Sequence, residues 1–271
     1  MRNAKVRRLV LIVMLPVLVV LAGGAAAGVA WWRWDEGRQP QVRDAVAVMT
    51  RAVADAVTAA GPAVAVAVSG VVRATECELN PVRRGGIFSA NADLYTRPGE
   101  EEDVVTAMAE VLSRSYPVRR GGAVSGFRPL EAGPISGVRL SVRRLSQGWL
   151  SVSARTGCSL GSVPPESGEP VDPAARDAVT ALLADLGTRP ASFRTHQLPC
   201  ARGSTVTLAA VSEPVDSADL VTRLAGAVPA GAQLLDSGQA NLVAYRTGAV
   251  SVIVAAADDG TAVTTQYTVV C

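Results

Sequence analysis

The decapeptide EDVVTAMAEV at residues 102–111 recurs in altered form as ADLVTRLAGA at residues 218–227. Aligned position by position, the two stretches share an Asp, a Val, a Thr and an Ala, which are Asp103 and Asp219, Val105 and Val221, Thr106 and Thr222, and Ala109 and Ala225. Similarity of a chain to itself indicates a repeated structural unit. We therefore predict that the 271 residues contain two halves built on one plan.

A second pair of segments and the cysteines support the same division. VRLSVRRLSQG at residues 138–148 aligns with VSVIVAAADDG at residues 250–260. Cysteines bracket each half, Cys77 and Cys158 around the first and Cys200 and Cys271 around the second. An even number of cysteines in a chain expected outside the cytoplasm favours disulfides. Of the three possible pairings, the repeat predicts Cys77–Cys158 and Cys200–Cys271.

Periodicity gives the layout of each half. In the first half it predicts a helix from residue 42 to 57, strands at 62–72 and 88–94, a helix after residue 100, and a hairpin at 138–154. In the second half, Asp172 and Pro173 are typical of a helix start and Gly187 of a helix end. A strand at 206–210, a helix at 220–228 and a strand meander over 241–270 follow.

This order predicts an α+β fold with helices on one face of antiparallel strands. We expect an N-terminal transmembrane helix followed by two tandem, repeat-related α+β lobes, each helix-strand-helix-antiparallel strands and each with one disulfide. The expected lobes are residues 42–158 and 172–271. The stretch 159–171, rich in Ser, Gly and Pro, is the expected linker.

The N-terminus predicts a membrane anchor. Basic residues within 1–8 precede an uncharged run at residues 9–32, and a membrane helix needs about 20 apolar residues. Tryptophans close the run, and the basic flank favours a cytoplasmic N-terminus with the rest of the chain outside. Residues 33–41 are then a stalk. The alternative is a cleaved signal peptide with a small-residue site at residues 25–27, which would give a secreted protein.

The motifs of several enzyme classes are missing from the sequence. It has no P-loop, no dinucleotide-binding G-x-G-x-x-G and no lysine beyond Lys5. His196 is the only histidine, so the common zinc ligand sets are incomplete. We expect no catalytic residue, cofactor or metal. The enzyme alternative is a hydrolase that uses dispersed acidic residues, or a serine with His196.

The hexapeptide PVRRGG occurs twice, at residues 81–86 and 117–122. Arg83, Arg84, Arg119 and Arg120 form a candidate anion-binding site, because guanidinium groups match phosphate or carboxylate and glycine turns point N–H groups at an anion. Residues 73–160 carry a net charge of +3 and residues 161–271 one of −5. The alternative, which we prefer from the sequence, is that both copies are ordinary loops.

The predicted function is therefore broad. We expect a single-pass, extracytoplasmic, non-catalytic binding or envelope-assembly module, an arrangement common among bacterial envelope proteins. The alternative is binding of an anion or anionic polymer by the basic first lobe, with anionic lipid or wall polymer as the ligand. A protein of the envelope is the other expected partner. Nucleic acid is not expected for a chain that faces out of the cell.

Overall fold

The computed structural model describes residues 40–163, 172–201, 203–235, 239, 241–257 and 259–271. It contains two six-stranded antiparallel sheets with helices between their strands, an α+β arrangement. No helix in the described ranges is long and apolar enough to cross a membrane. The predicted membrane segment, residues 9–32, lies outside these ranges.

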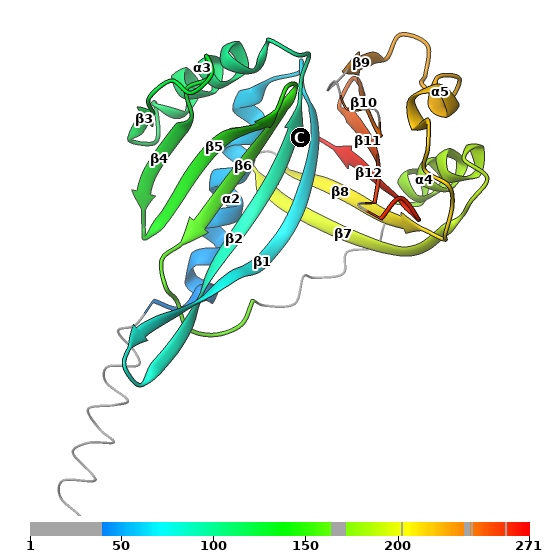
Figure 1. The fold of residues 1–271 in the computed structure, drawn as a ribbon. Helices are drawn as coiled ribbons and strands as arrows, with labels where there is room; N and C mark the ends of the chain where they lie inside the picture. Colours follow the sequence, from blue (N-terminus) through cyan, green and yellow to red (C-terminus); the bar gives the residue numbers. More distant parts are fainter. Residues whose placement is uncertain (1–39, 164–171, 202, 236–238, 240, 258) are drawn as a thin grey trace, which may run out of the picture. The chain divides into compact units, whose positions relative to one another are not determined.

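The first lobe is the first sheet with two helices (Figure 1). Its elements in chain order are α2 (Val42–Ala60), β1 (Ala65–Asn80), β2 (Arg83–Tyr95), α3 (Glu101–Leu112), β3 (Val118–Arg120), β4 (Leu130–Ile135), β5 (Val138–Ser146) and β6 (Trp149–Thr156). The strand order across the sheet is β1-β2-β6-β5-β4-β3.

The second lobe repeats this arrangement. Its elements are α4 (Pro173–Asp185), β7 (Pro190–Cys200), β8 (Gly203–Ser212), α5 (Leu220–Leu224), β9 (Gln233–Leu235), β10 (Leu242–Thr247), β11 (Val250–Ala256) and β12 (Val263–Val269). The strand order is β7-β8-β12-β11-β10-β9. Position for position, this is the order of the first sheet, with a helix before the first strand and another after the second.

The matched sequence segments occupy equivalent places in the two lobes. The decapeptides lie on α3 and α5, and the 11-residue segments lie on β5 and β11, the fifth strand of each sheet. Both predicted disulfides are confirmed, Cys77–Cys158 and Cys200–Cys271. Each joins the first strand of its sheet to the segment just after the last strand.

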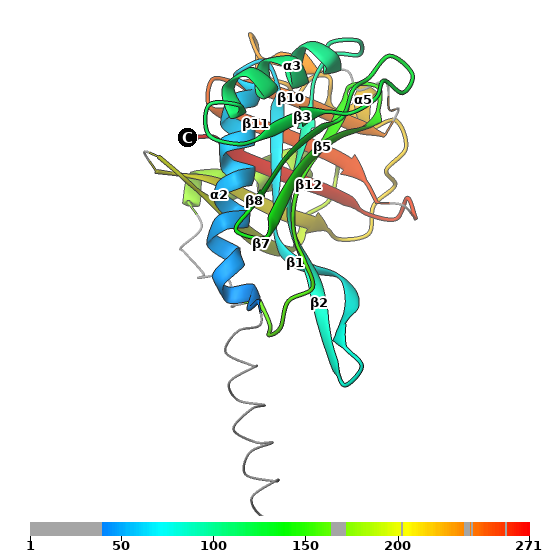
Figure 2. The same cartoon turned by 90° about the vertical axis from the view of Figure 1, so that its left-hand side faces the viewer.

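Alternation along the strands explains which face each sheet buries. On β5, Val138, Leu140 and Val142 are fully buried and belong to the core beneath α2 and α3. Residues two apart point to the same face, so the residues between them face away from the helices. The apolar stripe of α2 includes Met49, Val53 and Val57, all fully buried in this core. Figure 2 shows α2 lying alongside the strands of the first sheet.

Two local predictions on helix ends hold. Asp172 accepts a hydrogen bond from the Ala174 N–H at 3.0 Å and so caps α4, while Gly187 after this helix has φ +74°. The acidic run before residue 103 begins α3, where the helix dipole favours negative charge. Glu101 is 3% exposed and accepts hydrogen bonds from the Gly99 and Gly148 N–H groups, which fasten α3 to the β5–β6 turn.

The structure has strands that the predicted layout lacks, which are β3 and β4 in the first lobe and β7 and β9 in the second. Residues 159–160, assigned to the linker, pair with the first lobe through Gly86 and Gln41. The strand β7 was missed because nearly all of its residues are exposed or half-buried and lack the apolar alternation on which the prediction relied.

The described part of residues 41–271 packs as one compact unit, in which β1 makes the main contact between the lobes. The Arg246 guanidinium, from β10, donates hydrogen bonds to the carbonyl oxygens of Gly61 and Val64 at 3.1 and 2.8 Å. The Val68 N–H donates to the hydroxyl oxygen of Thr207, on β8, at 3.1 Å. The start of β1 therefore crosses the second sheet from β10 toward β8.

Candidate functional site: an arginine groove on the first sheet

The face of the first sheet that points away from its helices, here called the open face, carries arginines. On β5 these are Arg139 and Arg143, which alternate with the buried core residues and flank Ser141. On β6 the equivalent face presents Arg155. All three arginine side chains are exposed. The open face is thus positively charged over two neighbouring strands.

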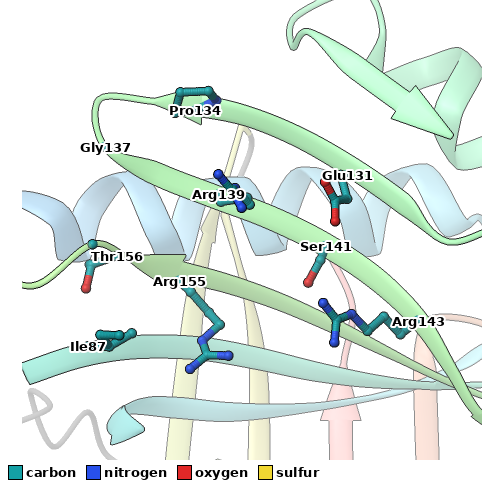
Figure 3. A pocket seen from close by; sticks show the side chains of 10 residues that line it. Ile87, Glu131, Pro134, Gly137, Arg139, Ser141, Arg143, Arg155 and Thr156 are labelled. Atoms are coloured by element: carbon teal, nitrogen blue, oxygen red, sulfur yellow. The ribbon is translucent and has the colours of Figure 1, made fainter. Parts of the chain in front are cut away.

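These arginines line a groove of about 440 Å3 (Figure 3). In the figure they extend from β5 and β6, and α2 passes behind these strands. The groove is also lined by Glu131 from β4 and by Ile87 from β2. Its floor therefore spans four adjacent strands of the sheet.

Two of the arginines oppose each other directly. Arg139 pairs with Arg155 in the register of β5 and β6, and like charges at directly opposed positions destabilise a sheet. Among the residues that the structure describes, no ion pair involves Arg139, Arg143 or Arg155. A bound anion between them would remove this repulsion, which makes the groove suited to a negatively charged ligand.

A row of uncharged polar groups separates the arginines. Ser69, Asn91, Ser153 and Ser141 are cross-strand neighbours on β1, β2, β6 and β5, and Glu131 continues the row on β4. Arg139 and Arg155 lie on one side of this row and Arg143 on the other. Arg139 and Arg143 are four residues apart on one strand, roughly 13 Å. Hydroxyl and amide groups in the row can donate or accept hydrogen bonds.

Asp93 lies on the same open face, next to the part that contacts the second lobe. Burial raises the pKa of the Asp93 carboxyl, and the hydrogen bond from the Trp149 indole N–H, at 3.1 Å, opposes that rise. The Trp149 ring stacks on Tyr95 with centroids 5.8 Å apart. Burial also raises the pKa of the Tyr95 hydroxyl, with a further contribution from the charge of Asp93.

The structure does not bring the four arginines of the PVRRGG copies together. Arg83 and Arg84 begin β2, while Arg119 and Arg120 lie on β3, the edge strand on the far side of β6, β5 and β4. A single site formed by both copies is therefore excluded by the strand order.

The expectation that both copies are loops is wrong in part, because both arginine pairs lie on strands while Gly121 and Gly122 lie outside β3. In the first copy, Gly85 and Gly86 belong to β2, where the segment after β6 passes close to the backbone. A Cβ atom on Gly85 would lie 2.8 Å from the Ser159 carbonyl oxygen and 3.0 Å from the Cys158 sulfur. Gly85 therefore allows close packing around the disulfide, while a Cβ atom on Gly86 would lie 2.6 Å from the Arg73 side chain. In this copy, the Arg83 side chain is buried, whereas the Arg84 side chain is exposed.

The second copy has a structural arginine and an exposed one. The Arg120 guanidinium donates to Glu102 at 2.7 Å, to Thr106 and to the Arg128 carbonyl oxygen, so it fastens α3 to the sheet edge. Arg119 alternates with it and opposes Glu131 in the register of β3 and β4. Arg119 is thus the one predicted arginine that neighbours the groove.

One signal for the groove was present in the sequence. The alternation VRLSVRR at residues 138–144 places Arg139, Ser141 and Arg143 on one face of a strand. The contribution of Arg155 depends on the hairpin register, which the sequence alone left open. Arg144, grouped with Arg143 in the sequence, instead donates to the Ser125 carbonyl oxygen and lies over the Phe127 ring.

His196, the histidine of the enzyme alternative, lies apart from this groove. His196 is on β7, the edge strand of the second sheet, opposite Thr207. In the described ranges, no group of three or more His, Cys, Asp or Glu side chains is arranged to hold a metal ion. Of the acidic residues at the start of α3, Glu101 and Glu102 are used in the helix and sheet contacts described above.

Comparison with known proteins leaves the family of this chain open. No known family matches its sequence, and no curated protein does. Among solved structures, it is similar to a chain of the Pseudomonas aeruginosa MucA/MucB complex, with 13% identity over 81% of this chain and 94% of that one. The TM-score is 0.14, a value too low to establish a shared fold or function.

Proposed function

We propose that this protein is a non-catalytic, extracytoplasmic binding module whose first lobe recognises an anionic component of the cell envelope through the arginine groove. The observation that carries the proposal is the set of three exposed arginines on one open face, two of them directly opposed in register. Guanidinium groups bind phosphate and carboxylate oxygens in a bidentate manner. Because the arginines have no ion pair among the described residues, their charge is available to a ligand.

The N-terminal run supports the location in this proposal. Residues 9–32 would anchor the chain in the cytoplasmic membrane, with residues 1–8 in the cytoplasm and residues 33–41 as a stalk. The two disulfides fit an oxidising compartment. Protease treatment of intact cells and of lysed cells tests the orientation. Degradation of the C-terminal region only after lysis would contradict the proposed location.

Binding of anionic probes to the full-length protein in neutral detergent tests the groove. The probes are inorganic polyphosphate, poly-glutamate and phosphatidylglycerol vesicles, each titrated at low and at high salt. We expect salt-sensitive binding of at least one probe, because exposed charges are screened by salt. Arg139→Gln, Arg143→Gln and Arg155→Gln together should weaken it at least about tenfold, since each charged contact contributes up to about 1 kcal/mol at an exposed site.

The matched control removes the same charge elsewhere. Arg84, Arg97 and Arg114 are exposed and lie outside the groove, so their triple replacement by Gln changes net charge equally. We expect the control variant to bind within about twofold of the wild type, because it leaves the groove intact. Equal losses in both variants would show a nonspecific charge effect and contradict the proposed site. Binding of no probe would contradict it as well.

A further inference from the structure

The second lobe shows what an open face of this fold accommodates. Its open face holds the start of β1, an extended segment of the first lobe. Val64, which is contacted from β10, and Val68, which is contacted from β8, are four positions apart in the chain. In an extended chain this span is roughly 13 Å, and three strand spacings are roughly 14 Å. The segment therefore lies extended and nearly at right angles to the strands beneath it.

The contacts of this segment combine apolar packing with hydrogen bonds to its backbone. Ala65 and Ala67 pack against Leu242, Ala244 and Ile253 of the second sheet. The Thr207 hydroxyl accepts the Val68 N–H and is 2.7 Å from the Thr268 hydroxyl. The second sheet thus binds main-chain groups through the Thr207 hydroxyl and the Arg246 guanidinium, while its apolar residues pack against the small apolar side chains of the segment.

The equivalent positions of the first sheet have a different chemistry. The repeat alignment and the strand registers equate Arg139 with Ser251, Arg143 with Ala255 and Arg155 with Thr268. Between the arginines, the first sheet has Ser141 and Ser153 where the second sheet has Ile253 and Gln266. The first sheet therefore offers hydroxyl groups flanked by positive charge at positions where the second sheet has uncharged side chains.

We infer that the groove of the first lobe binds an extended acidic peptide segment of a partner protein, laid across β6 and β5. This inference rests on the proposed anion-binding function and names its ligand class. Successive side chains of an extended chain point in opposite directions. A segment above Ser153 and Ser141 would direct alternate side chains toward Arg139 and Arg155 on one side and Arg143 on the other. Acidic side chains at these positions form ion pairs with the guanidinium groups, and backbone N–H groups of the segment donate hydrogen bonds to the serine hydroxyls.

The test uses the full-length protein in neutral detergent and a synthetic dodecapeptide with Glu at every second position and Thr between. Its controls are the same peptide with Gln for Glu, and one with alternate backbone nitrogens methylated. We expect the acidic peptide to bind, each control peptide to bind at least about tenfold more weakly, and the triple Gln variant of the groove to lose at least about tenfold in affinity.

Replacement of the two serines tests whether they contact the peptide backbone. The double variant Ser141→Ala, Ser153→Ala should weaken the acidic peptide about threefold or more and the peptide with methylated backbone nitrogens by less, because only free backbone N–H groups donate to these hydroxyls. Binding of polyphosphate but not of the acidic peptide, with loss in the arginine variant, would overturn the peptide inference and keep the proposed function. Binding of neither would overturn both.

Discussion

The open faces of the two sheets occupy equivalent places in one repeated fold, yet the first carries an exposed groove and the second is covered at the equivalent positions. On β11, Ser251 and Ile253 are 0% and 2% exposed beneath the first lobe. On β5, the equivalent Arg139 and Ser141 line an exposed groove. The repeated fold thus contains two similar sheet faces. Small and apolar side chains allow the face of the second sheet to pack against the first lobe, whereas the arginines keep the groove of the first sheet exposed.

The largest effect should come from exchanging residues between the two faces. Ser251→Arg places an unpaired charge where the first lobe covers the sheet, and we expect a loss of about 3–5 kcal/mol in the free energy of unfolding. The reverse exchange, Arg139→Ser, should change this free energy by no more than about 0.5 kcal/mol, because the site is exposed. The Arg139→Ser replacement also removes the repulsion between two like charges that face each other across β5 and β6, since Arg139 pairs with Arg155.

Urea unfolding of both variants measures this difference. If Ser251→Arg were as stable as Arg139→Ser, the open face of the second sheet would have to be uncovered in solution, and the contrast between the faces would be lost. Ser251→Ala is the control for the loss of the hydroxyl. The Ser251 hydroxyl is buried, and no hydrogen-bond partner for it occurs in the described part of the chain, so its removal should cost little.

An intermediate effect is expected from the disulfides, which test how alike the two lobes are. The bonded cysteines are 81 residues apart in the first lobe and 71 in the second. Closure of loops this similar in length constrains the unfolded chain to nearly the same extent. Replacement of either pair by Ala should therefore lower the free energy of unfolding by about 2–4 kcal/mol.

Thermal or urea unfolding measures the free energy of unfolding of the two double variants. We expect nearly equal decreases in this free energy, since the chain-entropy contribution depends on the logarithm of loop length. A loss confined to one pair would show that the two disulfides stabilise their lobes differently despite their equivalent positions. The double replacement of both cysteines in a pair avoids the free thiol that a single replacement would leave.

The smallest effect concerns Asp93, at the boundary between the exposed and covered parts of the first open face. Because burial raises the pKa of this carboxyl in the folded protein, the folded state binds its proton more tightly than the unfolded state. The contribution of Asp93 to stability is then most favourable below its ordinary pKa of 3.8. It declines as pH rises through the folded pKa and stays constant above it.

Asp93→Asn removes this titration and keeps an oxygen that can accept the Trp149 N–H. The variant should be more stable than the wild type at neutral pH, and the advantage should vanish below the ordinary pKa of the carboxyl. Thermal unfolding at a series of pH values measures both. Identical pH profiles for the two proteins would contradict a raised pKa at Asp93.

Much of the fold could be predicted because its signals are local. The caps at Asp172 and Gly187 depend on neighbouring backbone groups, and the disulfide pairing follows once the repeat at residues 102–111 and 218–227 is noticed. The strand β7 escaped prediction because its exposed residues carry no periodic pattern. The arginines of the PVRRGG copies were misassigned because a repeated hexapeptide says nothing about which sheet edge each copy joins.

The sequence by itself determined the α+β class, the two related halves, the cysteine pairs and the basic character of the first lobe, because these depend on composition, spacing and local periodicity. Only the tertiary structure decided that Arg139, Arg143 and Arg155 share one groove and that the equivalent face of the second sheet is covered by β1. Strand register and packing between lobes join residues far apart in the chain, and those contacts set the position of the candidate site.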